Sequence, residues 1–184
     1  MIQMQIKIIF PLLVLVSFLL SCNNDKVAPP KQINAEKLKK PLEKANVHMV
    51  KVENEEIEDY IRRHEWSMIT TGTGLRYLIY KNGQGIKAIS GDVVKINYKV
   101  NLINGVDCYS SKDDGPLEFA TDKADVINGL EEAILLMREG DKAKVIIPSH
   151  LAYGLLGDEK KVPKRATLIY DIEVLKVMKP KPQK

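Results

Sequence analysis

Val94–Leu102 reads V-K-I-N-Y-K-V-N-L, with apolar and polar residues in strict alternation. Successive side chains of a β-strand point to opposite faces of its sheet, so this pattern is typical of a strand with one buried face. Elsewhere in the chain, residues 142–147 and 167–175 repeat the alternation, and residues 75–81 repeat it more weakly. The sequence therefore predicts four strands that each present one apolar face to a core.

A single core helix is predicted between Asn128 and Gly140. Asn128 is a favourable N-cap, Glu131 stands where it would complete a capping box, and Gly140 is a typical stop. The apolar face of this helix consists of Leu130, Ile134 and Met137. Several strands with one short helix predict an α+β domain and not a βαβ array.

The N-terminal residues 1–21 have the pattern of a secretory signal peptide. Lys7 precedes the uncharged run Ile8–Leu20, which is too short to cross a bilayer, since about 20 apolar residues are needed. Leu19–Cys22 resembles the bacterial lipobox, so we expect cleavage before Cys22 and lipidation of its thiol. Two or more acyl chains hold a protein stably on a membrane. The alternatives are a plain signal peptide with an incidental cysteine and an uncleaved anchor.

Residues 22–52 are predicted to form a flexible tether because proline, lysine and asparagine dominate the first part of this segment. Residues 53–70 are predicted to form an amphipathic helix, with apolar residues at helical spacing and Arg62-Arg63 near its end, as the helix dipole favours. This helix either packs on the main domain or serves as a dimerisation or docking arm. The globular domain is expected at 71–178 and a short tail at 179–184.

Composition argues against several classes of function. Basic residues (28) and acidic residues (24) are interleaved along the chain, whereas nucleic-acid binding needs a clustered basic face, so no nucleic-acid partner is expected. The three histidines are scattered without ligand spacing, and neither a metal site nor a cofactor is predicted. With Cys22 lipidated, Cys108 has no partner for an intramolecular disulfide. It is expected to be a small buried apolar residue, the alternative being a reactive thiol.

Three motifs in order resemble the FKBP family of peptidyl-prolyl cis-trans isomerases. Val126–Leu130 is similar to the family's Val-Ile-x-Gly-Trp, and Ala152–Gly154 matches its Ala-Tyr-Gly. Val162–Tyr170 is similar to Ile-Pro-x-x-Ala-Thr-Leu-x-Phe, and the strand 94–102 corresponds to the family's tyrosine-containing second strand. The resemblance covers roughly residues 74–178. It implies an antiparallel sheet curled around one short helix, preceded here by the tether and the extra helix.

The resemblance also implies a site for a prolyl ring in an apolar hollow between helix and sheet. Tyr98 and Tyr170 are expected in its walls, while the backbone N–H of Ile127 and the hydroxyl of Tyr153 are expected to bind substrate carbonyls. Further substrate contacts are implied for Cys108, Tyr109, Leu117, Val126, Leu130 and Val162. The long connection 149–161 is expected to overhang this hollow, with a charged tip at 158–161.

Four positions depart from the family pattern. Cys108 and Tyr109 stand in place of a phenylalanine and an aspartate, and Leu117 and Leu130 replace a phenylalanine and the usual tryptophan. The hollow is therefore expected to be less aromatic, to bind the macrolides FK506 and rapamycin more weakly, and to prefer different residues before proline. Tyr109 is placed to replace part of the lost aromatic area.

Two functions remain open from the sequence. The first is a peptidyl-prolyl isomerase that assists the folding of exported envelope proteins and takes proline-containing polypeptides as clients. The second is a non-catalytic FKBP-like lipoprotein that serves as a scaffold or chaperone-like subunit of an envelope complex. The whole chain also resembles the gliding-motility-associated isomerase lipoproteins of Bacteroidota. A lipid-anchored place on the periplasmic face, on the outer membrane, is expected.

Overall fold

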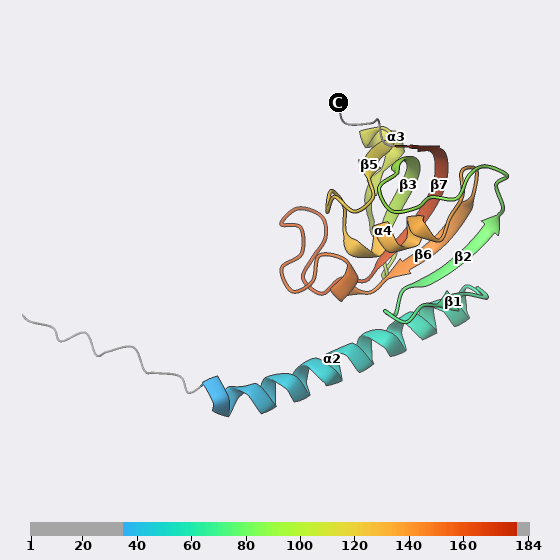
Figure 1. Cartoon of the computed structure of the whole chain (residues 1–184). Coiled ribbons are helices and arrows are strands. Elements are labelled where there is room, and N and C mark those ends of the chain that lie inside the picture. The colour runs from blue at the N-terminus through green and yellow to red at the C-terminus, as the bar shows by residue number, and fades with distance from the viewer. Residues whose placement is uncertain (1–34, 180–184) are drawn as a thin grey trace, which may run out of the picture. The chain divides into compact units, whose positions relative to one another are not determined.

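The computed structural model describes residues 35–179. Its seven strands form one antiparallel sheet in the order β1-β2-β6-β7-β3-β4, with β5 paired to β3. The strands are β1 (Ile69–Thr70), β2 (Arg76–Lys81), β3 (Val93–Leu102), β4 (Asp107–Ser110), β5 (Leu117–Ala120), β6 (Lys142–Ile147) and β7 (Leu168–Met178). The sheet curls around a short helix, as Figure 1 shows, and the predicted α+β class is confirmed.

Three helices and one 3-10 turn accompany the sheet in the described part of the chain. They are α2 (Ala35–Arg63), α3 (Ser111–Asp114), α4 (Asn128–Leu135) and the 3-10 turn Ser149–Leu151. The described residues divide into two units between Leu42 and Glu43, and every contact discussed below lies within the second. No helix within residues 35–179 has the length and apolar character needed to cross a membrane.

The four strands predicted from alternation are β2, β3, β6 and β7. In β3, Val94, Ile96 and Val100 are almost fully buried, while the polar residues between them face outward. β7 lies between β3 and β6 and contributes four buried residues at period two, Leu168, Tyr170, Ile172 and Val174. These side chains and those of α4 form one core.

The core helix differs from its predicted boundaries. The N-cap is Ile127, with no side-chain hydrogen bond, and Asn128 is the first helical residue. The Glu131 carboxylate accepts a hydrogen bond from the backbone N–H of Asp122 and so does not complete a capping box. The helix ends at Leu135, well before Gly140, because backbone groups of residues 137–139 bond to the loop at residues 85–88.

The N-terminal helix also differs from the predicted boundaries. α2 begins at Ala35, within the expected tether, because this segment is rich in alanine, glutamate, lysine and leucine, which favour helices. It ends at Arg63 and not at residue 70, since Glu65 takes a left-handed φ of +54°, which terminates helices. The signal peptide, Cys22, the start of the tether and the tail from residue 180 lie outside the described residues.

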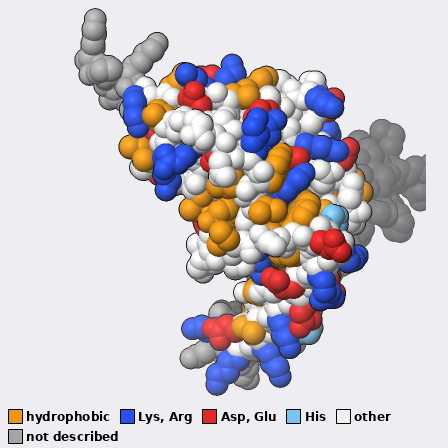
Figure 2. Space-filling view, turned by 90° about the vertical axis from the view of Figure 1, so that its right-hand side faces the viewer, with side chains coloured by type: hydrophobic (Ala, Val, Ile, Leu, Met, Phe, Trp, Pro, Cys, Tyr) orange, Lys and Arg blue, Asp and Glu red, His pale blue; other side chains and the backbone are white. Residues whose placement is uncertain are grey.

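Part of α2 packs on the opposite face of the sheet from α4. Ile57, Ile146 and Ile169 are buried together, with Tyr60 and Trp66 packed beside them. Arg76, 5% exposed, adds a salt bridge of 3.0 Å from Nη2 to Glu58 Oε1. The sheet is therefore apolar on both faces where α2 covers it. Elsewhere, acidic and basic side chains are interspersed among apolar ones on the face shown in Figure 2.

Candidate functional site

A cavity of about 460 Å³ opens between the sheet and the long loop that joins β6 to β7. We call it the tyrosine cavity. It is lined by Tyr98, Val100, Tyr109, Leu117, Tyr153, Asp158, Lys160 and Tyr170. Four of these eight side chains are tyrosines, so the cavity combines apolar ring surfaces with phenolic hydroxyls.

Strand register brings the walls of the cavity together. Val100 of β3 is paired with Tyr170 of β7 on one side and with Tyr109 of β4 on the other. Tyr98 lies two residues before Val100 on the same face of β3, because side chains alternate along a strand. Leu117, on β5, is paired with Ile96 of β3. Three neighbours of β3 thus contribute one residue each to the cavity.

The fourth tyrosine comes from the loop at residues 148–167. Tyr153 is 37% exposed, the largest exposure among the cavity tyrosines. Its position is fixed by its neighbours, since the backbone N–H groups of Ala152 and Gly154 both donate to the carbonyl of Ser149, at 3.1 and 2.8 Å. Gly154 has a φ of +61°, where a residue without a Cβ is unstrained. The turn therefore presents Tyr153 at the cavity rim.

The charged tip of the loop is fastened to β4. The Tyr109 hydroxyl donates to the Asp158 carboxylate, which also accepts the backbone N–H groups of Lys160 and Val162 at 2.9 and 2.7 Å. The Lys161 ammonium lies 4.9 Å from the centroid of the Tyr109 ring, within the range of a cation–π contact. Tyr109 therefore stands at the cavity rim and ties the loop to the sheet.

The surroundings of the cavity keep its phenols neutral. Burial raises the pKa of Tyr98, Tyr153 and Tyr170. Nearby carboxylates add to this rise for Tyr98 and Tyr153, and neighbouring tyrosines and Cys108 add to it for Tyr170. The hydrogen bond to Asp158 raises the pKa of Tyr109 to about 12. Burial alone would raise the pKa of Asp158, but the bonds from Tyr109 and the backbone outweigh it and hold this pKa below its ordinary value. At neutral pH the tyrosine hydroxyls are protonated and can donate hydrogen bonds. The Asp158 carboxylate is ionised and already accepts hydrogen bonds from Tyr109 and the backbone.

The structure brings five of the ten predicted pocket residues to the cavity: Tyr98, Tyr109, Leu117, Tyr153 and Tyr170. Cys108, Leu130 and Val162 are instead buried in the core at 2–3% exposure, and Val126 and Ile127 are half-buried against it. Burial also raises the pKa of the Cys108 thiol, so this cysteine is a core residue and not an activated nucleophile.

Three lining residues were not named as site residues from the sequence. Val100 carries a usable signal, since it follows Tyr98 at period two on the cavity face of β3. Asp158 and Lys160 belong to the charged loop tip that was expected over the hollow, but the contact of Asp158 with Tyr109 has no signal in the sequence. Among residues 35–179 no cluster of His, Cys, Asp or Glu is arranged to hold a metal.

Several donors at the site have no partner within the described residues. The hydroxyls of Tyr98, Tyr153 and Tyr170 make no hydrogen bond among residues 35–179. The backbone N–H of Ile127 at the start of α4 is also unpaired within these residues, but Ile127 does not line the cavity. Free donors around an apolar cavity suit a ligand that brings carbonyl acceptors and an apolar ring. Such a ligand is a peptide segment with a compact apolar side chain.

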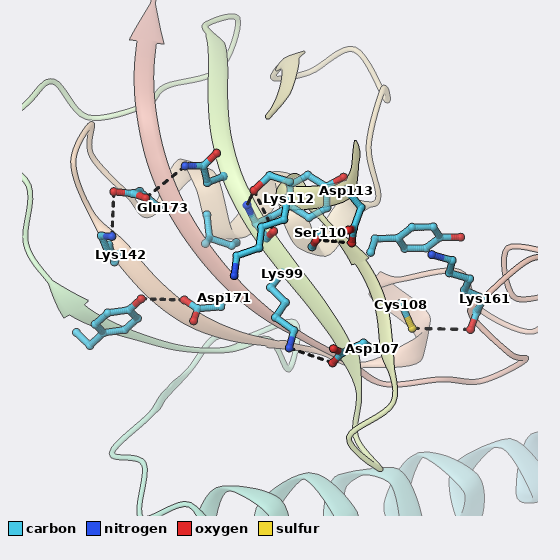
Figure 3. Close-up of a pocket in the computed structure, with 16 residues that line it drawn as sticks. Lys99, Asp107, Cys108, Ser110, Lys112, Asp113, Lys142, Lys161, Asp171 and Glu173 are labelled. Carbon is cyan, nitrogen blue, oxygen red and sulfur yellow. Dashed lines mark hydrogen bonds and ion pairs between the residues drawn. The ribbon is translucent and has the colours of Figure 1, made fainter. Parts of the chain in front are cut away.

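A larger hollow of about 650 Å³ runs along the polar face of the sheet. Figure 3 shows its ion pairs, in which Lys142 points toward Glu173 and Lys99 toward Asp107, each with 3.0 Å between nitrogen and oxygen. Tyr80 donates to Asp171 at 2.8 Å. Because these acidic and basic groups are paired with one another, the larger hollow presents no cluster of like charge to a ligand. The tyrosine cavity is the better candidate although it is smaller.

Comparison with known families gives one match, to the model described as FKBP-type peptidyl-prolyl cis-trans isomerase, over residues 84–175. The matched stretch includes all eight residues that line the tyrosine cavity. It excludes α2, which precedes residue 84.

Individual relatives agree with this match. The chain is 38% identical over 112 residues to "Probable FKBP-type peptidyl-prolyl cis-trans isomerase FkpA" of Neisseria meningitidis serogroup B, covering 60% of this chain and 40% of the relative. It is 42% identical over 91 residues to "FK506-binding protein 2" of Dictyostelium discoideum, covering 49% of this chain and 68% of the relative. The chain thus spans less than half the length of the bacterial relative.

Solved structures show the same fold. The crystal structure of FkpA from Escherichia coli superimposes with a TM-score of 0.62 at 30% identity, covering 80% of this chain and 75% of that one. The crystal structure of AtFKBP13 gives a TM-score of 0.58 at 31% identity, covering 60% of this chain and 98% of that one.

Proposed function

Because the chain belongs to the FKBP-type peptidyl-prolyl cis-trans isomerase family, we propose that it catalyses cis–trans exchange of X-Pro bonds in polypeptides. The observation that carries this proposal is the tyrosine cavity, where side chains from β3, β4, β5, β7 and one loop converge within the matched region. Its size and mixed lining suit a prolyl ring with the two peptide groups that flank it.

The chemistry needs no nucleophile or metal. An X-Pro bond resists rotation by about 18–20 kcal/mol, because its nitrogen lone pair is delocalised onto the carbonyl. Twisting the amide localises that lone pair and removes the charge-separated resonance form. An apolar cavity therefore binds the twisted amide better than the planar one, and this preference lowers the barrier. Each 1.36 kcal/mol of preference is a factor of about ten in rate.

The cavity residues take two kinds of role in this proposal. The rings of Tyr98 and Tyr170 enclose the proline, with Leu117 and Val100 beside them and Leu130 beneath in the core. The Tyr153 hydroxyl and the Ile127 N–H bind substrate carbonyls on either side of the rotating bond. Neither donor transfers a proton, which agrees with the raised pKa of Tyr153.

The test is prolyl exchange measured by NMR on short X-Pro peptides with several X residues, using the purified full chain. A Tyr98→Ala, Tyr170→Ala double variant, shown to be folded, serves as the control. Acceleration by the wild type that the double variant loses supports the proposal. No acceleration with any peptide contradicts it and leaves the non-catalytic binding lipoprotein. Calorimetry with FK506 and rapamycin tests the weakened macrolide binding expected from Leu117 and Leu130.

We propose further that the protein acts in the cell envelope on exported clients and is held there by lipid on Cys22, on the periplasmic face of the outer membrane. The support is the signal-peptide pattern and the lipobox-like Leu19–Cys22. Incorporation of labelled palmitate by the wild type but not by Cys22→Ser tests the anchor, and membrane fractionation tests the location. A link to gliding motility rests on the whole-chain resemblance alone. If a strain that lacks this protein spreads normally, the link is contradicted.

A further inference from the structure

One carboxylate on α2 holds both ends of the loop that carries Tyr153. Glu53 Oε1 accepts the backbone N–H of Ser149 at 2.6 Å and the hydroxyl of Thr167 at 2.7 Å, while its Oε2 accepts the Ser149 hydroxyl at 2.9 Å. Ser149 follows β6 and Thr167 precedes β7, so they mark the two points where the loop leaves the sheet. Both are buried, at 8% and 4% exposure.

Through Ser149, the same contacts connect Glu53 to the turn at Tyr153 on the cavity rim. The carbonyl of Ser149, whose N–H is bound by Glu53, accepts the N–H groups of Ala152 and Gly154 on either side of Tyr153. The carbonyl of Gly154 in turn accepts the N–H of Arg165 at 2.8 Å, two residues before Thr167. These hydrogen bonds, together with the short stretch of backbone from Arg165 to Thr167, form a closed path that joins Glu53 to the turn that presents the Tyr153 hydroxyl.

Between these points the loop is not packed tightly against the helix. A hollow of about 300 Å³ is lined on the helix side by Met49 and Val50 and on the loop side by Gly154 and Leu155. The remaining polar attachments of the loop lie at its other parts: His150 Nε2 lies 3.0 Å from the Thr73 carbonyl, and Asp158 accepts from Tyr109. Among the hydrogen bonds of residues 35–179, those of Glu53 are therefore the ones that connect α2 to the loop, and through Ser149 to the turn at Tyr153.

From this arrangement we infer that Glu53 is a positioning residue of the isomerase, which sets the place of the Tyr153 hydroxyl by clamping both ends of its loop. The inference rests on the proposed function. It gives the N-terminal helix, which lies outside the family match, a part in the activity. Displacements of about 1 Å in a positioned group cost up to about a hundredfold in rate.

The experiment compares two glutamates of α2 that contact different parts of the domain. Glu53→Ala removes all three loop bonds, Glu53→Gln retains an oxygen acceptor, and Glu58→Ala removes the salt bridge to Arg76 without touching the loop. For each variant, kcat and KM on an X-Pro peptide are measured together with thermal stability and the amide chemical shifts of residues 152–154. If Glu53→Ala does not fold, Thr167→Val removes one bond of the clamp in its place.

We expect Glu53→Ala to lower kcat/KM by about two- to tenfold, no more than the loss of the Tyr153 hydroxyl itself. Glu53→Gln should restore most of this activity, and Glu58→Ala should lower stability with activity kept within about twofold. In a Tyr153→Phe background Glu53→Ala has almost no further effect, because the hydroxyl it places is gone. Equal losses from Glu53→Ala and Glu58→Ala, or additive losses with Tyr153→Phe, overturn the inference. If the wild type is inactive, the proposed function fails. The placement of the Tyr153 turn by Glu53 is then tested by the amide chemical shifts of residues 152–154, and shifts that are unchanged in Glu53→Ala overturn the inference.

Discussion

At the scale of single residues, Tyr109 links the two sides of the cavity. Its ring lines the cavity, and its hydroxyl donates a hydrogen bond to Asp158 in the loop between β6 and β7. The resemblance to known motifs was sufficient to predict Tyr98, Tyr153 and Tyr170 as pocket residues, since those positions fall within motifs. The loop tip that contains Asp158 was expected over the hollow, but its bond to Tyr109 was not, because that contact joins residues 49 positions apart.

The Tyr153 hydroxyl is expected to contribute to substrate binding and little to stability. Because it has no partner among residues 35–179, Tyr153→Phe removes no hydrogen bond from the folded protein. We expect the catalysed exchange rate to fall by about two- to tenfold, the value of one hydrogen bond. The matched control is Tyr80→Phe, which breaks the bond to Asp171 away from the cavity. An unchanged rate in Tyr153→Phe would show that this hydroxyl does not touch the substrate.

Asp158 gives the loop a pH-dependent contribution to stability. Its pKa is lower in the folded protein, so the stabilisation is present above the ordinary value of about 3.9 and is lost as pH falls through the folded value. We expect the free energy of unfolding of the wild type to exceed that of Asp158→Asn at neutral pH. Urea titrations from neutral to acidic pH should show this gap closing below about pH 4.

The control for that titration is Glu159→Gln, which removes an exposed charge beside Asp158. Its stability should differ from that of the wild type by little at any pH, since exposed charges contribute little. A gap for Asp158→Asn that is the same at neutral and at acidic pH would contradict the assignment of this stabilisation to the carboxylate.

At the scale of secondary-structure elements, alternation located β2, β3, β6 and β7 because each has one face on the core. It missed β1, which has two residues, and β4 and β5, which have four each, because all three are too short to show a period. The C-terminal ends of α2 and α4 were wrong for a different reason. Both are set by backbone contacts or dihedral angles outside the helix, which side-chain periodicity does not report. The start of α2 was missed although its residues favour a helix, because the proline and asparagine content of the segment was taken as the sign of a tether.

Gly129 determines how closely α4 approaches the sheet. A Cβ on this residue would lie 2.3 Å from Ile147 Cγ2 and 3.2 Å from Leu151 Cβ. We expect Gly129→Ala to destabilise the protein by roughly 1–3 kcal/mol, the usual cost of overpacking a core. Gly72→Ala is the control, because a Cβ there meets nothing within 4 Å. Urea unfolding of both variants checks this, and equal stabilities would mean that α4 shifts freely on the sheet.

At the scale of the whole molecule, the helix α2, which lies outside the family match, packs on the sheet of the matched domain. Ile146 and Ile169 point away from the main core and are covered with Ile57 of α2. Their burial explains why β6 and β7 each contain three consecutive apolar residues, a break in the alternation expected of strands with one buried face. The helix is thus part of the hydrophobic structure of the domain.

Ile57 is expected to be the main apolar attachment of α2. Its side chain is 0% exposed, and Ile57→Ala should destabilise the protein by roughly 2–5 kcal/mol through the cavity it leaves. Val47, on the same helix but 69% exposed, serves as the control, and Val47→Ala should change stability by less than about 0.5 kcal/mol. Thermal and urea unfolding measure both, and a small effect of Ile57→Ala would mean that α2 is only loosely held.

The clamp at Glu53 also bears on how the protein folds. Its contacts with Ser149 and Thr167 span 96 and 114 residues of chain, among the longest separations in the molecule. Contacts so far apart in sequence slow folding, because a large loop must close before they form. Synthesis delivers α2 first and β7 last, so Ile57 of the helix stays exposed to water until the final strand has formed. The loop that carries Tyr153 is therefore among the last parts of the protein to be held in place.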